Sequence, residues 1–184
     1  MSEQAPTPES IGSIVLQPSA PIVAGSRDTW KLIYTVGPSG IEVSGGLRIF
    51  PPHRGMTFWE LGKVTAETSR PLAACEVQTF NDAPYSYHHS QPPHIQVMVL
   101  GERLIEGDQI TVTIGERGGY SRGYFLRARA TDHAYDDYPF EIYVDVLGNG
   151  TRPMEMVVKQ SWVQLPDAPT VEVIADRPQR FHVV

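Results

Sequence analysis

The sequence predicts an all-β protein, an antiparallel β-sandwich of immunoglobulin-like or jelly-roll-like type with little helix. Several short segments alternate apolar and polar residues with the two-residue period of a strand. Glycine and proline, 16 of each in 184 residues, are frequent enough for many tight turns. No segment of ten or more residues shows a capped helical period. About eight to ten strands at hairpin-like spacing are therefore expected.

In chain order, the strands are expected at residues 29–36, 46–50, 94–100, 109–115, 123–132, 140–146, 156–162 and 170–175. In the first, large apolar residues fall on every second position from Trp30 to Val36. Pro51 and Pro52 end the second, because proline cannot donate to a sheet ladder. Residues 55–64 are the best candidate for one or two helical turns.

The later strands differ in how many of their faces are apolar. Residues 94–100 are largely apolar on both sides, which favours a strand covered on both faces, whereas residues 109–115 have one polar face. The sequence Gly148-Asn149-Gly150 closes the 140–146 segment with a strong turn signal.

The chain is expected to form one domain after a short leader. Residues 1–10, "MSEQAPTPES", are polar and can bury little, so we expect a disordered leader. Residues 11–184 fit one sandwich domain. The leader lacks the apolar region of a secretory signal, and no run approaches the roughly 18–20 apolar residues of a membrane span. The expected location is the cytoplasm.

Charge and cysteine content exclude several kinds of site. A formal net charge of −6 without a cluster of Lys and Arg argues against a nucleic-acid partner. The single cysteine, Cys75, excludes an intramolecular disulfide and a zinc site with several thiolates. Its place in the apolar run "PLAACEV" is typical of a small buried hydrophobic residue.

Four segments together resemble a known family. Residues 24–49, 104–123, 140–150 and 165–174 resemble the amino-terminal β-rich region of an uncharacterised bacterial domain family, whose later half resembles PHP-type (polymerase and histidinol phosphatase) metallohydrolases. The likeness covers residues 11–184. The histidine-rich "GDLHxH" stretch of that later half is absent here, so no family metal ligand is carried onto this sequence.

The resemblance implies a non-catalytic accessory β-sandwich domain or subunit that packs against a PHP-like metallohydrolase partner. Such a chain is a fragment, a separately encoded subunit or a relative that lost the hydrolase half. No cofactor is expected. Exposed strand edges need cover, which a catalytic partner chain or a homo-oligomer would supply equally.

The segment "PYSYHHSQPPH" at residues 84–94 suggests an alternative, a small self-sufficient enzyme or metal-binding protein. Imidazole nitrogens bind transition metals; the candidate ligands are His88, His89 and His94, with His53 arriving from another loop. Adjacent histidines in an extended chain point to opposite faces, which favours a structural rim loop.

The same loop supports a third hypothesis, a ligand-binding module. Tyr85 and Tyr87, with Trp59 nearby, could form an aromatic shelf for a sugar or an aromatic molecule.

A fourth set of candidates lies in "TDHAYDDYPF", residues 131–140. His133 with Asp136 or Asp137 could pair a general base with an orienting carboxylate. The sequence contains no Gly-x-Ser-x-Gly nucleophile elbow. The two carboxylates serve equally well to cap a loop between strands.

Overall fold

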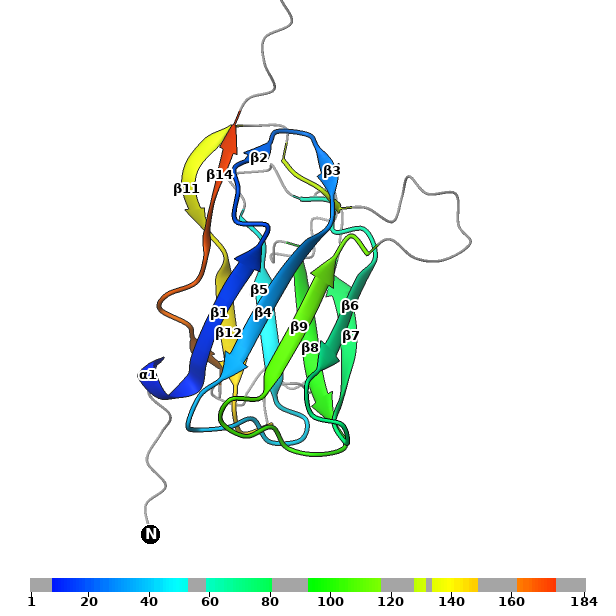
Figure 1. Ribbon diagram of the computed structural model, residues 1–184, viewed down its shortest axis with the longest axis vertical. Helices are drawn as coiled ribbons and strands as arrows, with labels where there is room; N and C mark the ends of the chain where they lie inside the picture. Colours follow the sequence, from blue (N-terminus) through cyan, green and yellow to red (C-terminus); the bar gives the residue numbers. More distant parts are fainter. Residues whose placement is uncertain are drawn as a thin grey trace, which may run out of the picture.

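Two antiparallel β-sheets lie face to face and enclose the core of the protein (Figure 1). The computed structural model describes residues 8–52, 59–80, 93–116, 128–131, 134–148 and 162–174. Across those ranges the helical content is a single turn, α1 (Pro8–Ile11). The predicted all-β sandwich is therefore confirmed. Over the same ranges, no helix has the length and apolar character needed to cross a membrane.

The strands form two large sheets and two small ones. The front sheet in Figure 1 contains, in spatial order, β1 (Gly12–Gln17), β4 (Trp30–Val36), β9 (Gln109–Ile114) and β6 (Val64–Thr68). The sheet behind it contains β13 (Trp162–Gln164), β12 (Glu141–Asp145), β5 (Gly46–Phe50), β8 (His94–Leu100) and β7 (Ala74–Phe80). The small sheets contain β11 (Tyr135–Pro139), β14 (Thr170–Ile174) and β2 (Ile22–Val23), and β10 (Ala128–Arg129) with β3 (Arg27–Asp28).

Alternating side chains fill the space between the two large sheets. Every second residue of β4 is buried, from Trp30 to Val36, and the residues between them are half-buried or exposed. Antiparallel pairing places Leu32 opposite Val112 of β9, so both side chains enter the core from the same sheet. The two-residue period predicted for these strands is confirmed.

Tyr34 connects the start of the described chain to the sandwich. Its side chain is fully buried, and its hydroxyl donates to the main-chain carbonyl of Ile11. The same carbonyl accepts a hydrogen bond from the Gly37 N–H at 3.0 Å. Residues 8–10 of the expected leader therefore belong to α1, and residues 1–7 lie outside the described residues.

The segment 131–140 differs from the loop that the sequence suggested. It contains β11, which pairs with β14 in antiparallel fashion. The register shifts between Tyr135 and Tyr138, so a bulge absorbs the extra residue. The sequence did not predict this strand, because it contains aspartate and proline, which are depleted in strands.

The segment 55–64 is not helical in its described part. Glu60 forms an isolated antiparallel bridge with Arg129, and β6 begins at Val64. Residues 53–58 lie outside the described residues.

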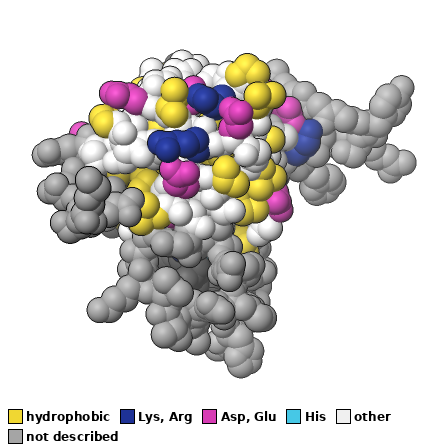
Figure 2. Space-filling view, turned by 90° about the horizontal axis from the view of Figure 1, so that it is seen from below, with side chains coloured by type: hydrophobic (Ala, Val, Ile, Leu, Met, Phe, Trp, Pro, Cys, Tyr) yellow, Lys and Arg dark blue, Asp and Glu magenta, His cyan; other side chains and the backbone are white. Residues whose placement is uncertain are grey.

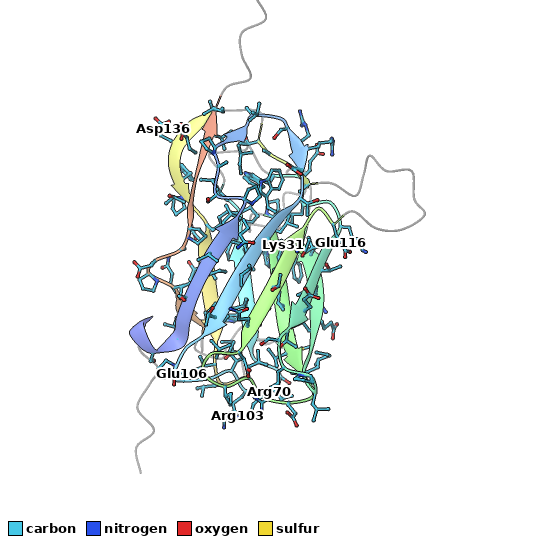
Figure 3. All side chains as sticks on the ribbon, viewed as in Figure 1. Lys31, Arg70, Arg103, Glu106, Glu116 and Asp136 are labelled. Atoms are coloured by element: carbon cyan, nitrogen blue, oxygen red, sulfur yellow. The ribbon has the colours of Figure 1, made fainter. Side chains whose placement is uncertain are left out.

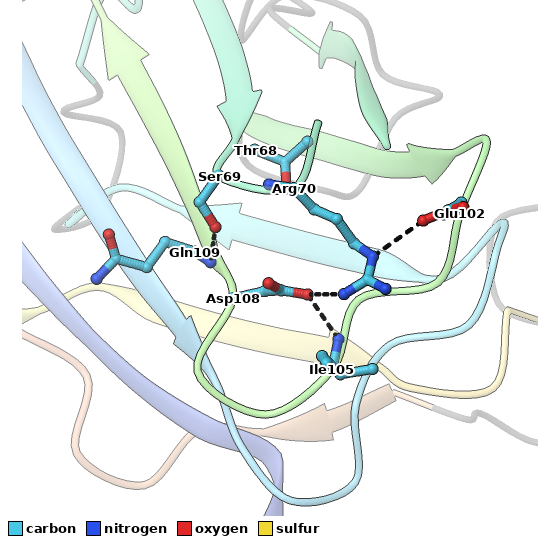
Figure 4. A network of polar contacts seen from close by, with 7 residues as sticks. All are labelled: Thr68, Ser69, Arg70, Glu102, Ile105, Asp108 and Gln109. Atoms are coloured by element: carbon cyan, nitrogen blue, oxygen red, sulfur yellow. Dashed lines mark hydrogen bonds and ion pairs between the residues drawn. The ribbon is translucent and has the colours of Figure 1, made fainter. Parts of the chain in front are cut away.

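Arg70 joins two loops at the lower end of the sandwich (Figure 4). Its guanidinium lies 3.1 Å from a carboxylate oxygen of Glu102 and 3.1 Å from one of Asp108. The Asp108 carboxylate also accepts a hydrogen bond from the Ile105 N–H at 2.8 Å. One arginine thus ties the corner between β6 and β7 to the loop between β8 and β9.

Apolar side chains are exposed at the same end. Val43, Leu72, Ile105 and Leu147 lie on its loops with exposed fractions of 42%, 72%, 45% and 46%. Seen from below, hydrophobic side chains are interrupted by Lys, Arg, Asp and Glu side chains (Figure 2). This end therefore mixes apolar and charged groups over the area that the view shows.

Candidate functional site

The outer side of the five-stranded sheet carries large aromatic side chains. Core residues such as Ile49, Ile95 and Ile142 hold the inward positions of β5, β8 and β12, so the positions between them point away from the core. We call this set the aromatic face. Its members are Arg48, Phe50, Phe80, His94, Tyr143 and Trp162.

Four rings from four neighbouring strands form a continuous row. Phe80 pairs with His94 in the β7–β8 register, and their rings are stacked with centroids 4.4 Å apart and an interplanar angle of 9°. Phe50 lies 4.9 Å from His94 on the other side. Tyr143 meets Phe50 edge to face at 5.9 Å. Such geometries are favourable for aromatic pairs, so the row is ordered by its own contacts.

Arg48 lies over a fifth ring, that of Trp162. Its guanidinium carbon lies 4.6 Å from the centroid of the Trp162 ring, a cation–π geometry. Burial lowers the pKa of Arg48, and the nearby Asp145 carboxylate opposes that shift. The Nε atom of Arg48 is buried and has no hydrogen-bond partner among the described residues. The aromatic face therefore contains a positive charge whose donor capacity is not fully used.

Asp145 lies beside the Arg48–Trp162 pair, opposite Trp162 in the β12–β13 register. It follows the core residue Val144 on β12 and therefore points to the outer side of the sheet, yet its exposed fraction is 0%. Its carboxylate accepts hydrogen bonds from the main-chain N–H groups of Leu147 and Gly148, both at 3.1 Å. These bonds allow a buried carboxylate to remain beside Arg48.

Comparison of the chain with protein-family models, with curated proteins and with solved structures found no match.

The aromatic face is suited to contact with an apolar or π-rich surface. The side chains of Phe50, Phe80, Tyr143 and Trp162 are half-buried, so part of each remains accessible. Aromatic residues and arginine are enriched in the centres of protein interfaces. The chemistry of this face favours recognition over a bond-breaking step.

Of the predicted metal ligands, His94 is described. It is 5% exposed and its ring lies between Phe50 and Phe80. Within the described ranges, no group of three or more His, Cys, Asp or Glu side chains is arranged to hold a metal ion. His53, His88 and His89 lie outside those ranges, so the metal site stays a prediction.

The structure places Trp59 in the core and not on an open shelf. Its side chain is 3% exposed and packs 4.8 Å from Trp30 and 5.9 Å from Phe140, measured between ring centroids. Three large rings fill one end of the sandwich in this way. Tyr85 and Tyr87 lie outside the described residues, and a ligand-binding role for them stays a prediction.

The predicted catalytic residues are described only in part. Asp136 lies on β11 at the upper end of the molecule, with an exposed side chain (Figure 3). Neither His133 nor the side chain of Asp137 is among the described parts of the chain. A catalytic role for this group stays a prediction.

Cys75 is half-buried on β7 and packs against the core. Burial raises the pKa of its thiol to about 11. The thiol is therefore protonated at neutral pH, which agrees with the predicted role as a small hydrophobic residue.

Sequence reasoning missed most of the aromatic face. Arg48, Phe50 and Tyr143 occupy the outward positions of strands that were themselves predicted, where polar residues are usual on a solvated sheet. The available signal was a large ring or an arginine at the outward position in each of several strands. For Phe80 even this signal was missing, because its strand, β7, was not predicted.

Proposed function

We propose that this chain is an accessory β-sandwich domain that binds a protein partner through the aromatic face. The observation that carries the proposal is the row of four stacked or edge-on rings beside the Arg48–Trp162 pair. Trp, Tyr and Arg dominate the residues whose truncation weakens protein complexes most.

Preorganisation supports the same proposal. The Phe80, His94 and Phe50 rings already contact one another, and Arg48 rests on Trp162. Side chains that are fixed before association lose less conformational entropy when a partner binds. A partner could therefore gain affinity from a small number of contacts at this face.

A PHP-like metallohydrolase is the partner class that we propose, and the sequence resemblance is its support. In this role the sandwich would pack beside the catalytic chain and shape its substrate entrance. The Arg48 guanidinium, whose buried Nε has no hydrogen-bond partner among the described residues, is suited to donate to a carbonyl or carboxylate oxygen of that chain.

Coexpression with a PHP-like hydrolase encoded beside this chain tests the proposal. The affinity is measured by titration calorimetry for the wild-type protein, for Phe80→Ala and for Tyr143→Ala. Each truncation is expected to weaken the complex by about 2 kcal/mol, or roughly 30-fold. Leu72→Ala is the matched control, because it removes an exposed apolar side chain at the lower end of the sandwich.

Binding that is unaffected by both aromatic truncations would contradict the assignment of this face. Circular dichroism of each variant separates loss of contact from loss of fold. A complex formed between two copies of this chain, detected by light scattering and abolished by the same truncations, would replace the hydrolase with a homo-oligomer.

A further inference from the structure

The outer side of the four-stranded sheet is hollowed, opposite to the aromatic face. The hollow has a volume of about 500 Å³, within the range of roughly 300–1,000 Å³ that is usual for small-molecule sites. Polar side chains line most of it: Thr29, Lys31, Thr65, Glu67, Thr113 and Glu116. Figure 3 shows Lys31 and Glu116 close together over this sheet.

Three of these residues form one row across three strands. The antiparallel registers place Lys31 of β4 opposite Thr113 of β9, and Thr113 opposite Thr65 of β6. Because neighbouring strands lie about 4.8 Å apart, the row spans roughly 10 Å. Glu67 lies two residues beyond Thr65 on the same side of β6, opposite Thr111 of β9, and so flanks the row along β6.

Four of the lining side chains have unused hydrogen-bonding capacity. The Thr29 hydroxyl donates to the Gly115 carbonyl at 2.6 Å, and Glu116 pairs with Lys63. The other four polar side chains of the lining form no hydrogen bond or ion pair with any described residue. They are Lys31, Thr65, Glu67 and Thr113. The hollow thus presents an ammonium donor, two hydroxyls and a carboxylate acceptor to whatever enters it.

We propose that this hollow binds a neutral, hydroxyl-rich ligand, a monosaccharide or a disaccharide. Each sugar hydroxyl both donates and accepts, which matches the mixture of donors and acceptors along the row. The positive charges of Lys31 and Lys63 are balanced by the negative charges of Glu67 and Glu116. A ligand with one net charge would satisfy one sign and leave the other without a partner.

An NMR titration of the full-length protein tests the proposal. The neutral probes are glucose, galactose, mannose and cellobiose; the comparators are glycine, a zwitterion, and glucuronate, an anion. At least one neutral probe is expected to shift the amide resonances of Thr65 and Thr113 with a Kd at or below ~10 mM.

Two valine substitutions on the same strand provide a matched pair. Thr113→Val removes a hydroxyl inside the hollow, and Thr111→Val removes one from the same side of β9 outside the lining. Both threonines are half-buried, and valine suits a strand equally well. Thr113→Val is expected to weaken binding by ~3- to 10-fold, as for one lost hydrogen bond, and Thr111→Val to leave it within about twofold.

Three results would overturn the proposal. The first is that no neutral probe shifts these resonances at ~10 mM. The second is that only glycine or glucuronate does so. The third is that the two valine variants weaken binding equally, because Thr113 lines the hollow and Thr111 does not. The outcome is independent of the protein partner, since the hollow and the aromatic face lie on opposite sheets.

Discussion

Replacement of Tyr34 by phenylalanine isolates one buried hydroxyl. The wild-type hydroxyl donates to the Ile11 carbonyl, which keeps its second hydrogen bond from Gly37 at 3.0 Å in the variant. No acceptor is therefore left unpaired, and the loss is that of one hydrogen bond, about 1 kcal/mol in the free energy of unfolding. For a domain of this size, Tm should fall by roughly 2–4 °C at pH 7.

At high pH the Tyr34→Phe variant should become more stable than the wild-type protein. Burial raises the pKa of Tyr34 well above its ordinary value of 10.0. Between pH ~10 and the raised pKa of the folded protein, Tyr34 is ionised in the unfolded chain and protonated in the folded chain. In this range the free energy of unfolding falls by about 1.4 kcal/mol per pH unit. The stability linked to Tyr34 is thus complete below pH ~10 and declines above it. Since phenylalanine cannot ionise, the two stabilities should become equal near pH ~10.6.

Urea denaturation of both proteins from pH 7 to pH 11 measures this crossing. Ile14→Val is the control, because Ile14 is buried and lies opposite Tyr34 in the β1–β4 register. It should be destabilised by about 0.5–1.5 kcal/mol and keep that deficit at every pH. A Tyr34→Phe deficit that stays constant to pH 11 would refute the inferred burial of the ionisable hydroxyl.

Two further predictions concern the thiol and the glycines. The pKa of Cys75 is about 11, so its thiolate fraction is ~300-fold smaller than that of a free cysteine of pKa ~8.5, and its reaction with iodoacetamide should be slower by the same factor. Mass spectrometry measures the rate of labelling. Rapid labelling of the folded protein would contradict the prediction. Gly107→Ala places a side chain at φ +86 with nothing within 4 Å, so it should fold with a loss of about 1–2 kcal/mol. Gly46→Ala puts a Cβ 1.9 Å from the Val97 carbonyl oxygen and should not give folded protein by circular dichroism, whereas equal stability of the two variants would exclude this steric argument.

The sequence predicted β4 and β9 correctly because one face of each strand lies in the core. In β4 and β9 apolar residues recur at every second position because only those positions are buried. The edge strands β1, β6 and β7 were not predicted. No residue of β6 or β7 is fully buried, so the burial contrast between their two sides is weak, whereas β1 alternates buried and exposed residues over its last four positions.

The aromatic face shows a similar limit. Tyr143 and Phe50 are far apart in the sequence, and only the β5–β12 pairing brings their rings within 5.9 Å. Strand partners are set by the whole sandwich and not by the local pattern. His94 was predicted as a candidate residue, yet its neighbours Phe50 and Phe80 could be assigned only once the strand order was known.

Because of where the three tryptophans lie, the intrinsic fluorescence of the protein can report on two separate events, unfolding and partner binding. Trp30 and Trp59 are 2% and 3% exposed and lie 4.8 Å apart, so their emission reports whether the core is intact. Trp162 lies next to Arg48 on the outer side of the five-stranded sheet. A partner bound there would change the surroundings of Trp162 without disturbing Trp30 and Trp59. Comparison of the wild-type protein with Trp162→Phe therefore separates the optical signal of unfolding from that of association, without an added label.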